Sequence, residues 1–297
     1  MRTRPNVSGG ISDYKFSKNG NAIFYYFSDS NYTNNEFKGI ECVNGEFSQP
    51  IIFSPSINKF QNSPDFDISH DGTYLLLGSM TTGLFIYKKM GIGNYTLIQE
   101  INNAGVFTGL AFSPDETKFC FLRTGDAQLT VYSFKNDVAS FMNSTNGTVN
   151  PYGNSIVNDP KWLNNSFIYR DVSINNDQPS YLCTQFLIEV HGDNSLTIAE
   201  NKEVQDVNYA CRDTSGYGVA LAKVDRYSGK YGAVILDAVQ KKISTKDFNE
   251  TIYSDHFLLE STANQTRIAV VTYPITESKN TFRVLTLINA TGTYSIS

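Results

Sequence analysis

The chain has 297 residues, enough to bury a large hydrophobic core, and a formal net charge of −5. No block of Lys and Arg stands out, which argues against a nucleic-acid partner, because phosphate contacts need clustered basic residues. No apolar run reaches the roughly 18 residues of a membrane-spanning helix, and residues 1–10 lack the apolar stretch of a signal peptide.

One pattern recurs along the chain: an apolar anchor residue, a short polar turn, and a run of strand-forming residues. The anchors are Phe16, Ile68, Phe112, Trp162, Cys211 and Leu259. In the second copy, strands are expected over residues 65–69, 74–78, 84–88 and 95–100, separated by turns. The turns carry Asp-Gly, Asn-Gly and Pro-Asp, which supply the backbone angles of tight turns. Intervals of 44 to 52 residues between anchors fit four short strands, which make one propeller blade.

The repeat predicts an all-β fold, a single β-propeller of about six four-stranded blades. We expect a free arm over residues 1–10 and one propeller domain over residues 11–297. The blades are expected at about 11–58, 59–104, 105–150, 151–204, 205–250 and 251–297. Each blade would bury its faces against its neighbours. A β-sandwich or an irregular barrel, which also contains many short strands, is the alternative.

Two segments, residues 110–115 and 67–75, resemble the F-S-P-D-G-x-x-L core of WD-repeat-like and of YVTN or lactonase-type propellers. Residues 84–89 with 94–96 also resemble a hairpin of propeller repeats in surface and phage structural proteins. The resemblance covers about residues 60–135, and the Gly-His and Trp-Asp dipeptides of true WD repeats do not occur. It implies the fold and says little about activity, because propellers serve many unrelated tasks.

A set of polar residues stands three positions before the anchors. Its members are Asp13, Asp65, Asp159, Asn208 and His256, with Gly109 at the sixth position. In a propeller this position lies near the start of the innermost strand, so the set is expected at one mouth of the central channel. These groups could hold a divalent cation, and oxygen ligands favour calcium. The resemblance to lactonase-type propellers also implies a metal at the channel. The alternative is that Asp and Asn cap strand entries by local hydrogen bonds.

Other chemical motifs are sparse. The cysteines Cys42, Cys120, Cys183 and Cys211 lie in strand-like runs, where buried free thiols are expected; Cys183 with Cys211 is the one pair considered for a disulfide. The chain contains neither a Gly-x-Ser-x-Gly elbow nor a phosphate-binding Gly loop. We therefore predict no catalytic residue.

Nine Asn-x-Ser/Thr triplets are candidate N-glycosylation sites. They begin at Asn6, Asn31, Asn94, Asn143, Asn146, Asn164, Asn249, Asn264 and Asn289. Several fall in expected turns, where a bulky glycan fits. The pattern favours an extracellular or cell-surface glycoprotein, although an Asn-rich cytosolic or viral protein would show the same turns without sugars.

Three functions follow from different classes of protein. The leading one is a non-enzymatic structural or interaction module, such as a subunit of a surface filament, which binds proteins or glycans and self-associates, with residues 1–10 as one candidate joint. The second is a virion tail or spike propeller that binds a receptor. The third is a metal-dependent, lactonase-like hydrolase, in which the five polar residues polarise a carbonyl and a water.

Overall fold

The computed structural model describes residues 9–29, 35–54, 65–79, 83–102, 107–123, 128–145, 155–157, 160–174, 182–212, 217–223, 230–253, 259–261, 267–274, 281–288 and 293–296. All regular elements among them are strands, which confirms the all-β prediction. None of these residues belongs to a helix of the length and hydrophobicity needed to span a bilayer. The chain divides into two compact units, Met1–Met142 and Asn143–Ser297.

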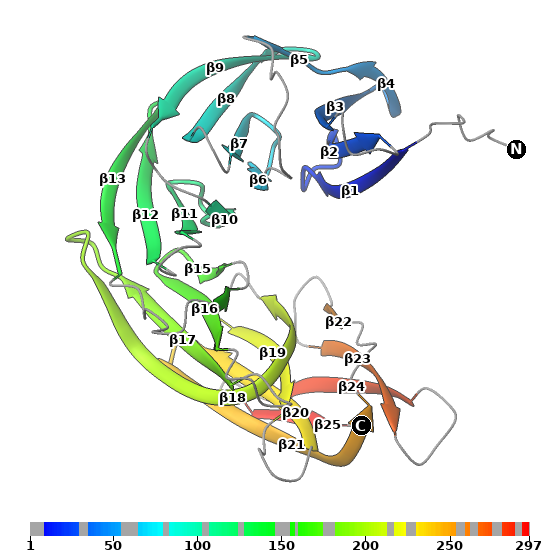
Figure 1. Cartoon of the computed structure of the whole chain (residues 1–297), viewed down its shortest axis with the longest axis vertical. Helices are drawn as coiled ribbons and strands as arrows, with labels where there is room; N and C mark the ends of the chain where they lie inside the picture. The colour runs from blue at the N-terminus through cyan, green and yellow to red at the C-terminus, as the bar shows by residue number, and fades with distance from the viewer. Residues whose placement is uncertain are drawn as a thin grey trace, which may run out of the picture. The chain divides into compact units, whose positions relative to one another are not determined.

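The first unit contains three antiparallel sheets (Figure 1). The first sheet consists of β1 (Gly9–Phe16), β2 (Ala22–Asp29), β3 (Asn35–Val43) and β4 (Glu46–Pro50). The second consists of β6 (Asp65–Ile68), β7 (Tyr74–Ser79), β8 (Gly83–Gly91) and β9 (Asn94–Ile101), with β5 (Ile52–Ser54) added parallel to β9. The third consists of β10 (Phe107–Phe112), β11 (Lys118–Arg123), β12 (Gln128–Lys135) and β13 (Val138–Ser144). Apart from β5, strands adjacent in sequence within each sheet pair with each other, as in a propeller blade.

The strands of the second unit are linked in one hydrogen-bonded path. They are β14 (Ser155–Val157), β15 (Lys161–Asn164), β16 (Phe167–Ile174), β17 (Leu182–Val190), β18 (Leu196–Arg212), β19 (Tyr217–Lys223), β20 (Lys230–Asp237), β21 (Lys242–Tyr253), β22 (Leu259–Ser261), β23 (Arg267–Pro274), β24 (Thr281–Ile288) and β25 (Thr293–Ile296). The path exists because β18 is 17 residues long: its first part pairs with β17 and its last part with β19. β21 is shared between β20 and β23 in the same way.

Three of the six anchors end an innermost strand, as expected, whereas Trp162 and Cys211 lie within β15 and β18 and Leu259 begins β22. Phe16, Ile68 and Phe112 are the last residues of β1, β6 and β10. The four strands predicted for the second copy are confirmed as β6, β7, β8 and β9. β1 begins at Gly9, which pairs with Asp29, so the last two residues of the predicted arm belong to the first sheet.

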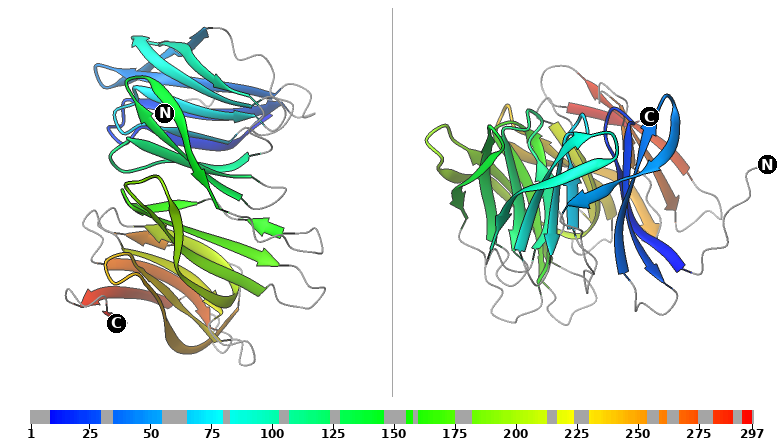
Figure 2. Two further views of the ribbon diagram at one scale, coloured as in Figure 1. Left: turned by 90° about the vertical axis from the view of Figure 1, so that its left-hand side faces the viewer. Right: turned by 90° about the horizontal axis from the view of Figure 1, so that it is seen from above.

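The core lies between sheets, because both faces of an inner sheet are apolar. In β7, Leu75 and Leu77 pack toward the first sheet, whereas Leu76 packs toward the third, and all three are fully buried. Burial of each such side chain contributes about 1.5–3 kcal/mol. A comparable core in the second unit joins Leu187 of β17 to Leu236 of β20. Figure 2 shows the resulting arrangement within each unit, where twisted sheets follow one another face to face.

Candidate functional site

The turn after each innermost strand repeats one set of hydrogen bonds in the first three sheets. In the second sheet, the Ser69 hydroxyl donates to Asp71 Oδ1 at 2.9 Å and accepts the N–H of Tyr74 at 2.8 Å. Asp71 Oδ1 also accepts the N–H of Thr73 at 2.8 Å. Gly72 adopts φ +78°, the left-handed conformation that glycine tolerates best. The F-S-P-D-G-like segment therefore builds a turn.

The first and third sheets contain the equivalent bonds with different residues. Ser17 with Asn19 and Ser113 with Asp115 replace the serine and aspartate of the second sheet, both at 2.7 Å. In the third sheet Glu116 takes the glycine position with φ +57°. The turns are also linked to one another, because Asn19 Nδ2 donates to the carbonyl of Asp71 at 2.8 Å. These contacts give the repeated motif a structural role.

Three innermost strands lose regular pairing close to the position three residues before the anchor, whereas Asp65 of β6 pairs regularly with Gly78. The register shifts next to Asp13 in β1, around Gly109 in β10 and around Asn208 in β18. Bulges of this kind re-aim side chains and are frequent beside active sites. The position three residues before the anchor is therefore a backbone irregularity in three sheets.

A charged cluster joins the innermost strands of the first unit. Lys15 of β1 reaches β6, where its Nζ donates to the carbonyl of Phe66 and lies 4.0 Å from Asp65 Oδ1 and 3.8 Å from Asp67 Oδ1. The three charged side chains are 18–31% exposed. The cluster, which we call the Lys15 cluster (Lys15, Asp65 and Asp67), is thus partly screened from water and still open to it.

The two carboxylates of the Lys15 cluster also accept hydrogen bonds from β10. Asp65 Oδ2 accepts the N–H of Leu110 at 2.7 Å, and Asp67 Oδ2 accepts the N–H of Phe112 at 2.8 Å. Asp65 Oδ1 accepts the N–H of Phe66 at 2.8 Å. Within the described part of the chain, Asp67 Oδ1 accepts no hydrogen bond and lies near Lys15 alone. That oxygen is available to take a proton from a water molecule.

The Lys15 cluster does not fit a calcium ion. Lys15 already places a positive charge beside both carboxylates, and three of their four oxygens accept backbone N–H groups. Calcium needs six or more oxygen ligands. Over the described ranges, no group of three His, Cys, Asp or Glu side chains could hold a metal.

The five predicted site residues are described to different extents. Asp65 lies in β6 and accepts backbone N–H groups. Such bonds are those expected of a residue that caps a strand entry, the alternative to a cation ligand. Asp13 and Asn208 lie in β1 and β18, and their side chains are outside the described part. Asp159 and His256 lie outside the described residues altogether. A role for these four residues, with or without calcium, stays a prediction.

Lys15 and Asp67 were missed by the sequence analysis. Both stand one position before an anchor, two positions after the predicted site residues Asp13 and Asp65. The equivalent residues of two other sheets are Ala111 and Ala210, so no polar series marked this position.

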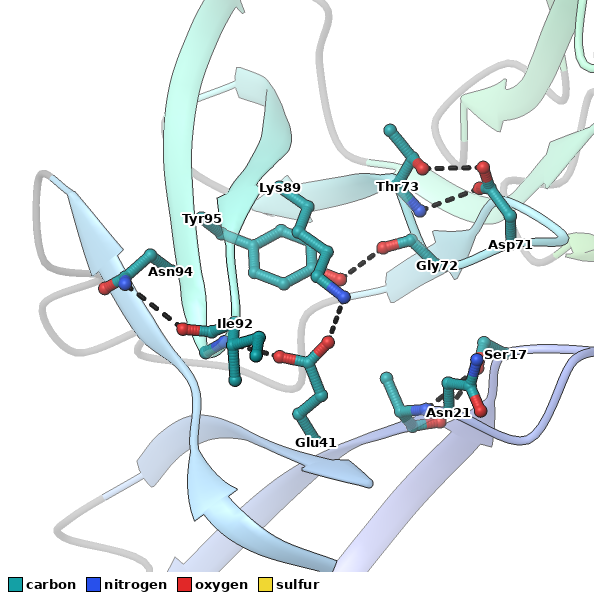
Figure 3. A network of polar contacts seen from close by, with 12 residues as sticks. Ser17, Asn21, Glu41, Asp71, Gly72, Thr73, Lys89, Ile92, Asn94 and Tyr95 are labelled. Carbon is teal, nitrogen blue, oxygen red and sulfur yellow. Dashed lines mark hydrogen bonds and ion pairs between the residues drawn. The ribbon is translucent and has the colours of Figure 1, made fainter. Parts of the chain in front are cut away.

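A second polar network lies between the first and second sheets (Figure 3). Glu41 of β3, 3% exposed, accepts hydrogen bonds from Lys89 Nζ and from the N–H of Gly93 in the β8–β9 turn. The Tyr95 hydroxyl donates to the carbonyl of Gly72, and burial raises the Tyr95 pKa. The Glu41 bonds join the first sheet to the second and the Tyr95 bond lies within the second, so the network has a structural role.

The remaining sequence predictions are tested in part. Cys120 is buried and Cys42 half-buried, and both are free thiols. The side chains of Cys183 and Cys211 are outside the described part, so their pairing stays open. Self-association through the N-terminal arm also stays a prediction, because residues 1–8 are not described.

Comparison with known proteins gives the fold. No family model matches the chain, and no curated protein sequence matches it significantly. The chain is similar to the solved structure of prolyl oligopeptidase B from Galerina marginata, at 12% identity and a TM-score of 0.59, over 97% of this chain and 41% of that one. It is similar to the periplasmic gluconolactonase of Pseudomonas aeruginosa, at 11% identity and a TM-score of 0.53, over 95% and 82%. It is also similar to a putative 6-phosphogluconolactonase from Bacteroides fragilis, at 11% identity and a TM-score of 0.56, over 95% of this chain and 82% of that one.

These comparisons correct one prediction and confirm another. The prediction that the chain is not an enzyme is contradicted, because the similar structures bear the names of enzymes. The resemblance to lactonase-type propellers is confirmed at the level of fold. The chain has the β-propeller fold.

Proposed function

We propose that the chain is an enzyme, a propeller hydrolase that opens the ring of a sugar lactone. The observation that carries the proposal is its similarity to a gluconolactonase and to a putative 6-phosphogluconolactonase, over 95% of this chain and 82% of each of theirs. The Lys15 cluster is the proposed site, because it is a partly exposed charged group on the innermost strands. Propellers commonly bind ligands at such strands, around the central channel.

The charges of the cluster favour a neutral substrate. Two carboxylates and one ammonium leave a net negative charge, which repels the phosphate or carboxylate of an anionic sugar. A neutral lactone meets no such repulsion. We therefore expect a gluconolactone-type substrate to be preferred over its phosphorylated counterpart.

The proposed reaction uses residues of the cluster directly. Asp67 Oδ1 takes a proton from water while the water oxygen attacks the lactone carbonyl carbon. The Lys15 ammonium donates to the carbonyl oxygen, where negative charge develops. The ring C–O bond then breaks, the ring oxygen takes back the proton that Asp67 removed from the water, and the product is an open-chain sugar acid. No step passes through a metal.

The test is the rate of ring opening of gluconolactone by the purified chain, followed with a pH indicator. We expect turnover above the spontaneous rate, and a loss of about 10²–10⁴-fold in Asp67→Asn, the size of a general-base contribution. The amide of this variant can still accept the N–H of Phe112, so the fold is kept. The matched control is Lys38→Met, which removes an exposed lysine of the first sheet paired with Glu36.

Two outcomes would overturn the proposal: no turnover by the wild-type chain, or full activity in Asp67→Asn. Chelation should leave the rate unchanged, since Lys15 supplies the positive charge at the site. Loss of activity on chelation would show that the reaction requires a bound metal ion.

We also propose that the chain works outside the cytoplasm. One similar enzyme is periplasmic, and Asn94, which begins a glycosylation triplet, is exposed at the start of β9. Mass spectrometry of the native protein tests this location, because an attached N-glycan requires a secretory route.

A further inference from the structure

Asn94 begins an Asn-Tyr-Thr triplet at the tip of the β8–β9 hairpin. Its side chain is exposed, and its Nδ2 donates to the carbonyl of Ile92 at 3.2 Å (Figure 3). A primary amide carries two N–H groups. One can keep the bond to Ile92 while the other is replaced by a sugar.

The backbone around Asn94 leaves room for a bulky group. Asn94 is paired with Gly91 across the hairpin, and a Cβ added at Gly91 would meet no atom within 4 Å. The turn itself is bonded to the neighbouring sheet, because the buried carboxylate of Glu41 accepts the N–H of Gly93. The turn is therefore anchored at Gly93, and space is open next to Gly91.

Three large aliphatic side chains close to Asn94 in the sequence or in the sheet are exposed. Ile52, Met90 and Ile92 are 64%, 67% and 63% exposed. Ile52 is the register partner of Asn94 in the parallel β5–β9 pair, so the two side chains point to the same face of the sheet. Grouped exposed aliphatic side chains usually mark a surface that something covers.

We propose that Asn94 is N-glycosylated and that the first sugars of the glycan cover Ile52, Met90 and Ile92. Sugar rings have apolar C–H faces that pack on aliphatic side chains. The transfer forms a bond between Asn94 Nδ2 and the anomeric carbon of a lipid-diphosphate-linked oligosaccharide. It breaks the bond from that carbon to the phosphate, and the amide proton leaves with the lipid diphosphate. The proposal rests on the extracytoplasmic location and is independent of the lactonase activity.

The other triplets whose Asn side chains are described are poorer acceptors. Asn143 is half-buried and its Nδ2 donates to the carbonyl of Asn194 at 3.2 Å. Asn164 is half-buried too, and its Oδ1 accepts the N–H of Ser166 at 2.9 Å. Asn94 alone among these three is exposed, so it should be the most occupied of them.

The experiment expresses the full chain behind a secretory leader in a eukaryotic host. Glycopeptide mapping reports the occupancy of each triplet. We expect the Asn94 peptide to carry a glycan in most molecules, and the Thr96→Val variant to lose the mass of one glycan. The matched control is Ser166→Ala, which removes the Asn164 triplet and leaves the Asn94 glycan in place. An unmodified Asn94 would overturn the proposal.

A second measurement tests coverage of the aliphatic group. Enzymatic deglycosylation of the folded protein should raise the fluorescence of a hydrophobic dye, and Ile52→Thr should reduce that rise. Dye fluorescence that is unchanged by deglycosylation would remove the covering role. Gluconolactone hydrolysis is measured in parallel, so failure of the enzymatic proposal remains distinguishable from failure of this one.

Discussion

Single buried hydroxyls hold the turns of the first unit. Ser17, Ser69 and Ser113 are at most 2% exposed, and each bridges the end of an innermost strand to the start of the next strand. A buried polar group that loses its partner costs the full desolvation free energy of that group. The serine of the repeat is therefore as important to the turn as the glycine.

Replacing one of these serines should destabilise the protein measurably. Ser69→Ala leaves the N–H of Tyr74 without its hydroxyl acceptor, and we expect a loss of about 1–3 kcal/mol in the free energy of unfolding. Urea unfolding measures it. The control is Ser133→Ala, whose hydroxyl makes one exposed bond at 3.3 Å to the Ser140 carbonyl. Equal losses in the two variants would contradict the role of burial.

The turn aspartates should make stability depend on acid. Burial raises the pKa of Asp71, but hydrogen bonds from Thr73 and Ser69 outweigh it, so the pKa is lowered; Asp115 behaves in the same way. A lowered folded pKa stabilises the protein above the ordinary carboxyl pKa of about 3.9, and this stabilisation is lost as pH falls through the folded value.

A single variant tests this acid dependence. Asp71→Asn should weaken the fall in the urea midpoint below about pH 4. The fold should tolerate it, since Asn19 already makes the equivalent bonds in the first sheet. An acid profile identical to that of the wild type would contradict the assignment.

Strands of neighbouring sheets are connected by charged pairs at similar places. Strand three of one sheet reaches the following sheet, as Lys88 does to Asp137 at 2.7 Å and Glu189 does to Lys241 at 2.7 Å. Glu41 is the buried member of the series. Its partners are Lys89 Nζ and the N–H of Gly93. The buried Glu41 should therefore contribute more to stability than the exposed charged pairs.

The comparison of Glu41→Ala with Glu189→Ala measures that difference. Glu41→Ala leaves the buried N–H of Gly93 without its acceptor, and we expect a loss of about 1–3 kcal/mol in unfolding free energy. Glu189→Ala breaks a pair whose lysine side chain is 53% exposed, and the loss should be below about 1 kcal/mol. The reverse order of losses would contradict the argument.

The sequence predicts most of the strands because their determinants are local. β6 to β9 follow from apolar runs separated by Asp-Gly and similar turns. The parallel strand β5 and the sharing of β18 were not predicted, since no turn residue marks a chain that passes between sheets. Lys15 and Asp67 meet across sheets from positions 52 residues apart, which no local spacing reveals.

For the molecule as a whole, net charge should influence the choice of substrate. The chain has 29 acidic and 24 basic residues, so an anionic substrate approaches against a repulsive field. Salt screens such a field beyond about 10 Å at 0.1 M.

The salt dependence of two substrates tests this effect. We expect kcat/KM for 6-phosphogluconolactone to rise with ionic strength, while that for neutral gluconolactone stays unchanged. Potassium chloride titration of initial rates measures both. A fall in kcat/KM for the phosphorylated lactone would instead indicate a local basic approach path.

β18 also limits how this sequence can change in length. Gln205 pairs with Leu182 on one side and with Lys223 on the other, so one residue is bonded to both neighbouring strands. A deletion within a strand inverts the facing of every side chain beyond it. A one-residue deletion near Gln205 would thus shift the pairing of β18 with both β17 and β19, and tolerated length variation should be found elsewhere in the chain.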